Sequence, residues 1–196
     1  IIRPLDNPVF SEGLYVLHGN LAESAIVRPT VVTRSMFDVT GPARVFEGME
    51  ECLDALREHK INAGDIIVLR YEGPRGGPGL TDVFKVMAYL VALNLHEKCA
   101  VITDGKVSGF AKGPFICQVT PEAAVGGNIA LVEEGDLIHI DLNNRSLELL
   151  VSDEVLQERR RTWKPKECRV KTGLLTLYAK LALPSTEGAG ISLKIE

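Results

Sequence analysis

Hydrophobic residues along this chain form short continuous runs that alternate with amphipathic stretches. Two runs, Ile66–Leu69 and Cys99–Ile102, hold four consecutive apolar residues, a pattern typical of strands buried on both faces. Between them, Thr81–Leu95 places its apolar residues on one broad face of a helix that Thr81 and Asp82 can cap. Strand, glycine-rich loop, helix and strand in this order predict a βαβ unit with parallel strands and a right-handed crossover.

The segments on either side of this unit carry shorter patterns of both kinds. Amphipathic spacing predicts a helix at Met49–Lys60, and a polar stretch predicts a surface helix at Asp153–Arg161. Together the elements predict a mixed α/β chain in which hairpins and the βαβ unit form a partly closed β-barrel with flanking helices. Strands are expected at Gly13–Asn20, Ala25–Val32, Ile129–Glu133, Leu137–Leu142 and Leu147–Val151, a turn followed by a strand at Thr40–Phe46, and a further helix at Leu174–Ala182.

Composition narrows the class of protein. The 196 residues are enough for one domain with a real core, and 45% hydrophobic with 24% charged residues is ordinary for a soluble globular protein. A net charge of −4 without a basic block argues against nucleic acid as a partner. No apolar run approaches the roughly 20 residues of a membrane-spanning helix, so we expect no membrane partner.

The four cysteines are scattered and show no C-x-x-C spacing. Cys52, Cys99 and Cys117 lie among apolar residues, which predicts buried thiols in a reduced, cytoplasmic setting. They are poor candidates for a metal or cluster site within this chain.

The start of the chain differs in character from the rest. Ile1 is not a methionine, and two prolines within the first eight residues indicate an extended segment. We therefore expect residues 1–12 to be an interdomain linker, residues 13–196 to be a single domain, and the chain to be part of a longer polypeptide.

Two glycine-rich turns carry the candidate chemistry. Each follows one of the apolar strands: Arg70–Gly79 contains Glu72, and Thr103–Gly109 contains Ser108. A strand that ends in such a turn can present one reactive side chain from a rigid element. The two turns therefore predict one wall of an active site.

Each candidate residue also has a purely structural interpretation. Ser108 needs a neighbour that lowers its pKa before it can act as nucleophile or base, and the alternative is a turn serine that bonds its own backbone. Glu72 suits Mg²⁺, or is an exposed strand-end carboxylate. Arg75 can hold a substrate carboxylate or phosphate, or pack locally, and Lys106 fits a loop that binds an anion. The glycine spacing matches neither a dinucleotide fingerprint nor a P-loop.

Further motifs continue along nearly the whole chain. They are Leu17-His18-Gly19-Asn20-Leu21-Ala22, Gly41-Pro42-Ala43-Arg44-Val45-Phe46, Val119-Thr120-Pro121-Glu122-Ala123, Gly126-Gly127-Asn128-Ile129-Ala130 and Gly135-Asp136. In this order, and with the two turns, they resemble the C-terminal domain of the dihydroxy-acid dehydratase / phosphogluconate dehydratase family. The resemblance implies an α/β (mixed) fold, a β-barrel-like swivelling β/β/α domain with flanking helices, similar to that of aconitase-type enzymes.

The resemblance also implies an activity and roles for residues. The family dehydrates a 2,3-dihydroxy acid to a 2-keto acid with Mg²⁺ and an iron–sulfur cluster, whose ligands lie in an N-terminal domain outside this chain. It implies that Ser108 removes the C2 proton, that the cluster iron takes the C3 hydroxyl, and that Glu72 is a Mg²⁺ ligand. Ser108, Gly109, Lys106 and Arg75 are the expected substrate-binding residues. The complete enzyme is expected to be a cytoplasmic homodimer, organellar in a eukaryote, and the separated domain to be inactive.

Departures from the family pattern leave the substrate open. Lys106 stands where an arginine is common, and Phe110-Ala111 stands where the family often has Gly-Thr. Dihydroxyisovalerate, an intermediate of branched-chain amino acid biosynthesis, and a sugar acid both fit. Two other functions also stay open: a small partner subunit of a split aconitase-type dehydratase, and a non-catalytic module that binds sugar acids.

Overall fold

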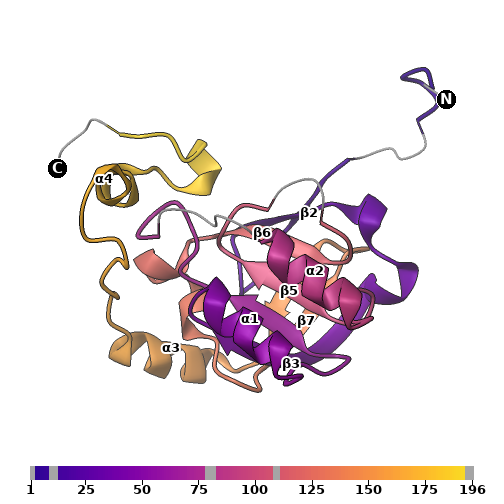
Figure 1. The fold of residues 1–196 in the computed structure, drawn as a ribbon, viewed down its shortest axis with the longest axis horizontal. Helices are drawn as coiled ribbons and strands as arrows, with labels where there is room; N and C mark the ends of the chain where they lie inside the picture. The colour runs from indigo at the N-terminus through magenta and orange to yellow at the C-terminus, as the bar shows by residue number, and fades with distance from the viewer. Residues whose placement is uncertain (1–2, 9–12, 78–82, 108–110, 193–196) are drawn as a thin grey trace.

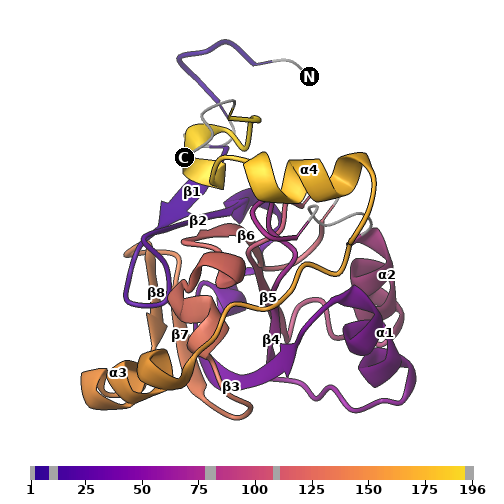
Figure 2. The ribbon, with the colours of Figure 1, turned by 90° about the vertical axis from the view of Figure 1, so that its left-hand side faces the viewer.

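An eight-stranded mixed sheet forms the centre of the fold (Figure 1), and it is curled until its two end strands, β1 and β8, nearly meet (Figure 2). The structure is a computed structural model that describes residues 3–8, 13–77, 83–107 and 111–192. The strands lie in the order β1-β2-β6-β5-β4-β3-β7-β8. Their bounds are β1 Tyr15–Leu17, β2 Ser24–Val27, β3 Asp38–Phe46, β4 Ile66–Leu69, β5 Ala100–Thr103, β6 Phe115–Thr120, β7 Leu137–Asp141 and β8 Ser146–Leu149.

Parallel strands form the middle of the sheet and antiparallel strands form its ends. β3, β4, β5 and β6 run parallel, and β2 and β7 pair antiparallel on the two sides of this group. The outer strands are then joined through the backbone of His18. Its backbone N–H donates to the carbonyl of Arg145 at 2.9 Å, and its carbonyl accepts from the N–H of Leu147 at 2.9 Å. These bonds bring β1 against β8 and nearly close the barrel.

The central strands are buried on both faces, as their continuous apolar sequence predicts. In β4, Ile66 and Val68 point into the barrel core, whereas Ile67 and Leu69 point to the helices outside it. Helices α1 (Met49–Arg57) and α2 (Phe84–Ala92) lie side by side against this outer face (Figures 1 and 2). The parallel pair β4–β5 with α2 between its strands confirms the expected βαβ unit.

Two further helices lie away from this pair. Ser152 caps α3 (Asp153–Thr162) by accepting from the N–H of Val155, and α4 (Leu174–Leu181) follows a segment without regular structure. Figure 2 shows this connecting segment running across the molecule from α3 to α4. The observed fold is the mixed α/β barrel with flanking helices that the sequence predicts.

Some of the expected elements are wrong in detail. Residues 129–133 are not a strand: Asn128–Leu131 is a 3₁₀ helix, because the carbonyls at this point accept from Arg70 instead of forming a ladder. The expected second half of Ala25–Val32 is likewise a 3₁₀ turn, Pro29–Val31, which begins at the proline. The expected turn at Thr40 lies inside β3.

Other expectations fall partly outside the described residues. Thr81 and Asp82, the expected helix cap, belong to this group, and the described helix begins at Phe84. Of the expected linker, residues 3–8 are described, are exposed and form no helix or strand. β6 was not among the expected strands.

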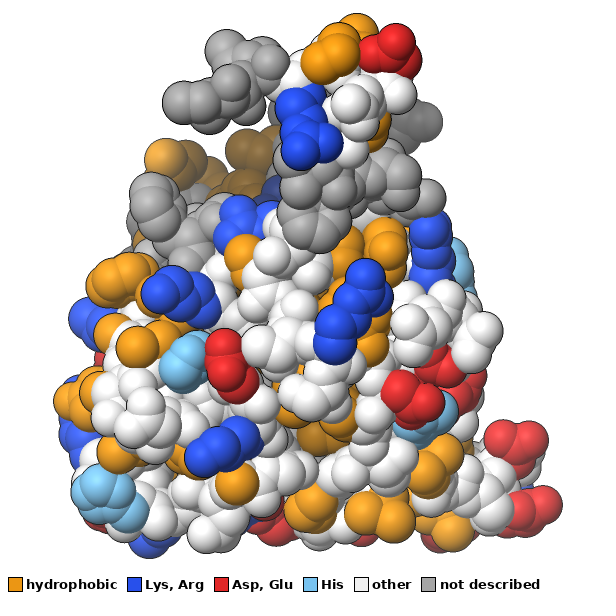
Figure 3. All heavy atoms as spheres, turned by 90° about the vertical axis from the view of Figure 1, so that its right-hand side faces the viewer, with side chains coloured by type: hydrophobic (Ala, Val, Ile, Leu, Met, Phe, Trp, Pro, Cys, Tyr) orange, Lys and Arg blue, Asp and Glu red, His pale blue; other side chains and the backbone are white. Residues whose placement is uncertain are grey.

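The surface carries charges of both signs. On the face in Figure 3, cationic side chains are scattered among anionic and neutral ones instead of gathering in one patch. Among the helices that the structure describes, none is long and apolar enough to cross a bilayer.

Ile102 lies at the centre of β5 and is fully buried in the barrel core. We expect Ile102→Ala to lower the free energy of unfolding by about 2–5 kcal/mol, because it removes buried methylene contacts and leaves a cavity. Urea unfolding measures the change, with Leu150→Ala as the control, since Leu150 is 50% exposed. Equal losses in both variants would contradict this assignment of the core.

Candidate functional site

The carboxyl ends of the four parallel strands meet at one edge of the sheet, where α/β proteins commonly bind ligands. Four acidic residues follow these ends: Glu47 after β3, Glu72 after β4, Asp104 after β5 and Glu122 after β6. Glu72, Asp104 and Glu122 are buried. This edge therefore concentrates carboxylates whose burial requires specific partners.

Asp104 connects the two glycine-rich turns. Its Oδ1 accepts from the N–H of Glu72 at 2.9 Å, and its Oδ2 accepts from the N–H groups of Tyr71 at 3.2 Å and Ala123 at 3.0 Å. The side chain is 0% exposed, so these N–H groups replace the water it would have in solution. One carboxylate thus fixes the turn of Glu72 to the strand end that leads to Ser108.

Burial and hydrogen bonding act on Asp104 in opposite directions. Desolvation raises the pKa of Asp104 to about 6, while the N–H donors of Glu72, Ala123 and Tyr71 lower it. At neutral pH the group is therefore ionised, and the three N–H groups bond to a negative charge.

Glu72 is buried but has a cationic partner. Its Oε1 accepts from the N–H of Met49 at 3.1 Å and lies 2.8 Å from Nη2 of Arg169. The same Nη2 donates to the carbonyl of Tyr71 at 3.1 Å. Within the described part of the chain, both contacts of the Glu72 carboxylate go to Oε1, which leaves Oε2 for a further ligand.

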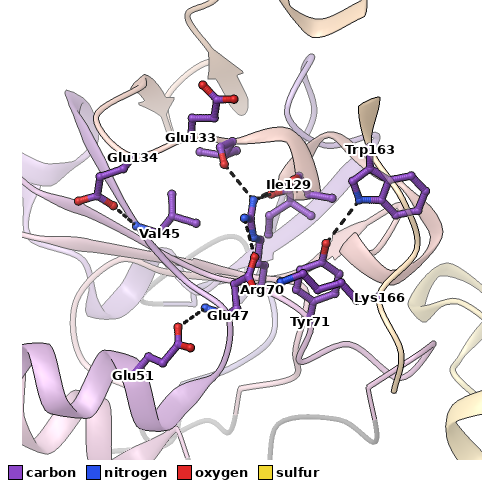
Figure 4. A network of polar contacts seen from close by, with 12 residues as sticks. Val45, Glu47, Glu51, Arg70, Tyr71, Ile129, Glu133, Glu134, Trp163 and Lys166 are labelled. Carbon is purple, nitrogen blue, oxygen red and sulfur yellow. Dashed lines mark hydrogen bonds and ion pairs between the residues drawn. The ribbon is translucent and has the colours of Figure 1, made fainter. Parts of the chain in front are cut away.

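Arg70 fixes the base of the Glu72 turn. Its Nη1 donates to the carbonyls of Ala130 at 2.8 Å and Val132 at 2.9 Å, with a longer bond to Ile129 at 3.3 Å. Its Nη2 donates to Oε1 of Glu47 at 2.9 Å (Figure 4). This guanidinium joins the loops that follow β3 and β4 to the 3₁₀ helix beyond β6.

Tyr71 has a left-handed backbone, with φ of 63°, which is unusual for an aromatic residue. Its ring is held from outside by the segment that leaves α3: Trp163 donates its indole N–H to the Tyr71 hydroxyl at 3.4 Å, and Lys166 lies over the ring (Figure 4). Lys166 also forms an ion pair with Glu47. The strained turn is therefore held between Asp104 and the C-terminal segment.

The glycines of the first turn serve close packing. A Cβ at Gly73 would lie 2.7 Å from Cγ of Glu122, so only glycine lets this turn approach the loop after β6. Glu122 is itself 0% exposed, and its Oε1 accepts from the N–H of Ser185 at 3.2 Å. Its Oε2 has no hydrogen-bond partner among the described residues.

The remaining predicted site residues have different outcomes. Ser108 and Gly109 lie outside the described residues. Arg75 and Lys106 are exposed at the same edge, as substrate-binding groups would need to be. Beside the second turn is a cavity of about 210 Å³ with a mostly apolar lining, formed by Leu14, Ile26, Arg28, Val31, Val107, Ala111, Gly113, Phe115, Cys117 and Gln118.

The cysteines do not fit cluster ligation. Cys52, Cys99 and Cys117 are buried and free, as expected, and Cys168 is partly exposed. Burial raises the pKa of Cys52 to about 12 and that of Cys99 to about 11, so neither presents a thiolate at neutral pH.

A second group of possible metal ligands lies at the start of β3. Asp38, His139 and Asp141 bring one ligand atom each to within 4.8 Å of one another. The carboxylate of Asp141 already accepts from both Asn143 and Asn144, whose bonds lower its pKa. Because β3 ends at the other edge, this group is separate from Glu72.

Several residues of the site were missed from the sequence, among them Asp104 and Arg169. Asp104 had a signal, since an aspartate directly after four buried strand positions must find partners without water. Arg169 had none, because its ion pair joins residues 97 positions apart (169 − 72) across a segment without a pattern.

The chain is similar to known proteins over nearly its whole length. The family described as "Dihydroxy-acid/6-phosphogluconate dehydratase C-terminal" matches residues 1–189. The chain is 48% identical over 197 residues to a dihydroxy-acid dehydratase of Nostoc sp., covering 100% of this chain and 35% of the relative. Those of Geobacter sulfurreducens and Ignicoccus hospitalis are 49% and 47% identical, over 96% and 97% of this chain and 34% and 35% of each relative. The chain thus spans about a third of the length of these relatives.

Asp104 predicts a specific pH dependence. Because its pKa in the folded state, about 6, lies above its ordinary value of 3.8, the folded state holds the proton more tightly than the unfolded state. Its contribution to stability is thus present below pH 4 and is lost as the pH rises to about 6, a change on the order of 3 kcal/mol.

Urea unfolding at pH 4, 5, 6 and 7 of the wild type and Asp104→Asn measures this contribution. We expect the variant to be less stable at every pH, since an amide cannot accept from all three N–H groups, and to lack this fall with pH. Parallel curves for the two proteins would show that Asp104 does not titrate in this range.

Proposed function

The chain belongs to the dihydroxy-acid/6-phosphogluconate dehydratase family, of which it is the C-terminal domain, and we propose that it supplies one wall of the active site of a 2,3-dihydroxy-acid dehydratase. The observation that carries this proposal is the bonding of Asp104 to the turn of Glu72. It ties together two strand ends, one leading to a carboxylate and the other to Ser108. In this proposal residues 1–12 are the linker and 13–196 the domain that follows it.

The reaction removes a proton from C2 of the substrate and a hydroxide from C3. The hydroxide takes up a proton and leaves as water. The resulting enol tautomerises to a 2-keto acid. Ser108 is the proposed base at C2, and the exposed cations Lys106 and Arg75, with Gly109, are the proposed groups that hold the substrate carboxylate. The departure of hydroxide is assigned to groups outside this chain, because the four cysteines here do not fit a cluster.

Glu72 is the proposed Mg²⁺ ligand of this domain. A carboxylate with one oxygen left over suits a hard cation, and the Asp104 bond to its backbone holds it in place. When bound, Mg²⁺ supplies Lewis-acid stabilisation of a negatively charged oxygen. The other ligands are proposed to come from the N-terminal domain of the complete protein. The complete protein, with both domains, is proposed to be a homodimer.

The apolar cavity beside the second turn favours one substrate class. Leu14, Ile26, Val31 and Phe115 line it, and Val107 stands directly before Ser108. An aliphatic substituent fits this lining better than the hydroxyl groups of a sugar acid. We therefore propose that the substrate is 2,3-dihydroxyisovalerate and not a sugar acid. In the relatives this region is part of one longer chain, which supports the proposal that it is a domain of a complete enzyme and not a separate subunit.

Ser108→Ala tests the proposed base. In the complete protein we expect kcat for 2,3-dihydroxyisovalerate to fall by about 10³-fold or more, with iron and sulfide content unchanged, since the cluster ligands lie elsewhere. Ser35→Ala, on an exposed turn, is the control. Retained turnover would remove Ser108 from the mechanism, and faster turnover of gluconate would overturn the substrate assignment.

Glu72→Gln tests the metal assignment. The amide keeps the size of the side chain but loses its charge, so we expect the Mg²⁺ concentration for half-maximal activity to rise by about tenfold or more. Glu158→Gln is the matched control, because Glu158 is an exposed glutamate that also pairs with an arginine, Arg161. An unchanged Mg²⁺ requirement would exclude Glu72 as a ligand.

A further inference from the structure

Arg169 neutralises Glu72 from a segment with independent anchors. Trp163 bonds to Tyr71, and Lys166 pairs with Glu47, so the segment is attached to the site edge at two points besides the arginine. These contacts involve neither the Glu72 carboxylate nor the Arg169 guanidinium. The guanidinium can therefore move while the segment stays in place.

The two partners of this ion pair differ in their surroundings. The Glu72 side chain is 6% exposed, whereas that of Arg169 is 50% exposed. A buried carboxylate needs a cation, but a half-exposed guanidinium can exchange its bonds to Glu72 and to the Tyr71 carbonyl for bonds to water. A divalent ion that binds at Oε2 of Glu72 repels the guanidinium at Oε1, so a second cation can open this pair at the arginine side.

The space around the guanidinium also matters. A Cβ at Gly48, whose φ is 137°, would overlap Nη1 of Arg169. Glycine at this position leaves the guanidinium room beside the carboxylate. A cavity of about 150 Å³ lies next to it, lined by Glu47, Tyr71, Gly76, Ala124, Lys166, Glu167 and Arg169.

We propose that Arg169 is an exchangeable cation for Glu72: it neutralises this carboxylate when no divalent ion is bound, gives it up when the ion binds, and so sets the affinity of the metal site. This inference rests on the proposed role of Glu72. An arginine that competes with the metal stabilises only the metal-free protein, which separates it from an ordinary structural partner.

Mn²⁺ binding to the complete protein, followed by electron paramagnetic resonance, tests the exchange. The site is defined as the binding component that Glu72→Gln removes, which separates it from the Asp38, His139 and Asp141 group. In Arg169→Gln we expect the Kd of this component to fall roughly fivefold, because the competitor is gone. Arg161→Gln, an exposed arginine paired with Glu158, is the control and is expected to leave the Kd unchanged.

Thermal unfolding of the same proteins gives the second readout. Without divalent ion, Arg169→Gln is expected to lower the Tm, since it leaves a buried carboxylate unpaired. With saturating Mn²⁺ the difference from the wild type is expected to disappear. Arg169→Lys, which keeps a cation, is expected to give an intermediate Kd and covers the case in which the glutamine variant fails to fold.

Two results would overturn the exchange. A Kd that is unchanged or higher in both Arg169 variants, with a Tm loss that persists in saturating Mn²⁺, would make Arg169 a structural partner in both states. If Glu72→Gln leaves every component of Mn²⁺ binding intact, the metal assignment itself fails, and the exchange fails with it.

Discussion

The candidate site depends on a single carboxylate that has no access to water. Asp104 is satisfied by three backbone N–H groups that come from two different loops. Its charge is tolerable only while these donors surround it, so the loops after β4 and β6 have little freedom to move separately. The left-handed conformation of Tyr71 is sustained in the same way, because the N–H that this conformation presents is one of the three donors.

The acidic edge of the sheet is balanced mainly from outside the barrel. Glu72 pairs with Arg169, and Glu47 pairs with Lys166 as well as with Arg70. Lys166 and Arg169 both lie on the irregular segment after α3. Among the described residues, Asp104 accepts from backbone N–H groups alone, and Glu122 accepts from the N–H of Ser185. A stretch without helical or strand pattern is therefore as much a part of the site as the strands are. Lys166 and Arg169 in this stretch are explained by the carboxylates with which they pair.

Local patterns predicted most of the strands and helices, although they missed β6, and they did not predict contacts between distant segments. The bounds of β4 and the helices at Met49 and Asp153 follow from apolar runs and amphipathic spacing, which act over a few residues. The strand expected at Ile129 does not form because its carbonyls accept hydrogen bonds from Arg70, about 60 residues earlier in the chain. No local sequence pattern predicts a hydrogen bond between residues so far apart.

The same division applies to the site. Glu72 was predicted as a candidate because its turn follows a recognisable strand and matches a family motif. Arg169 was not, since only the folded chain brings it to the carboxylate. The glycine spacing matched no nucleotide-binding motif, and the structure shows that Gly73 instead lets its turn pack against Glu122. Residue types predicted a candidate site at this edge, and the partners of its buried carboxylates came from the fold.

The joining of β1 to β8 through His18 has a consequence for how this domain behaves among other proteins. An open sheet of eight strands would expose two rows of unpaired N–H and C=O groups, which are templates for pairing with another chain. Here the strands that would form those rows lie against each other. Where these two strands meet, their backbone groups bond to each other and are not available to a strand of another chain.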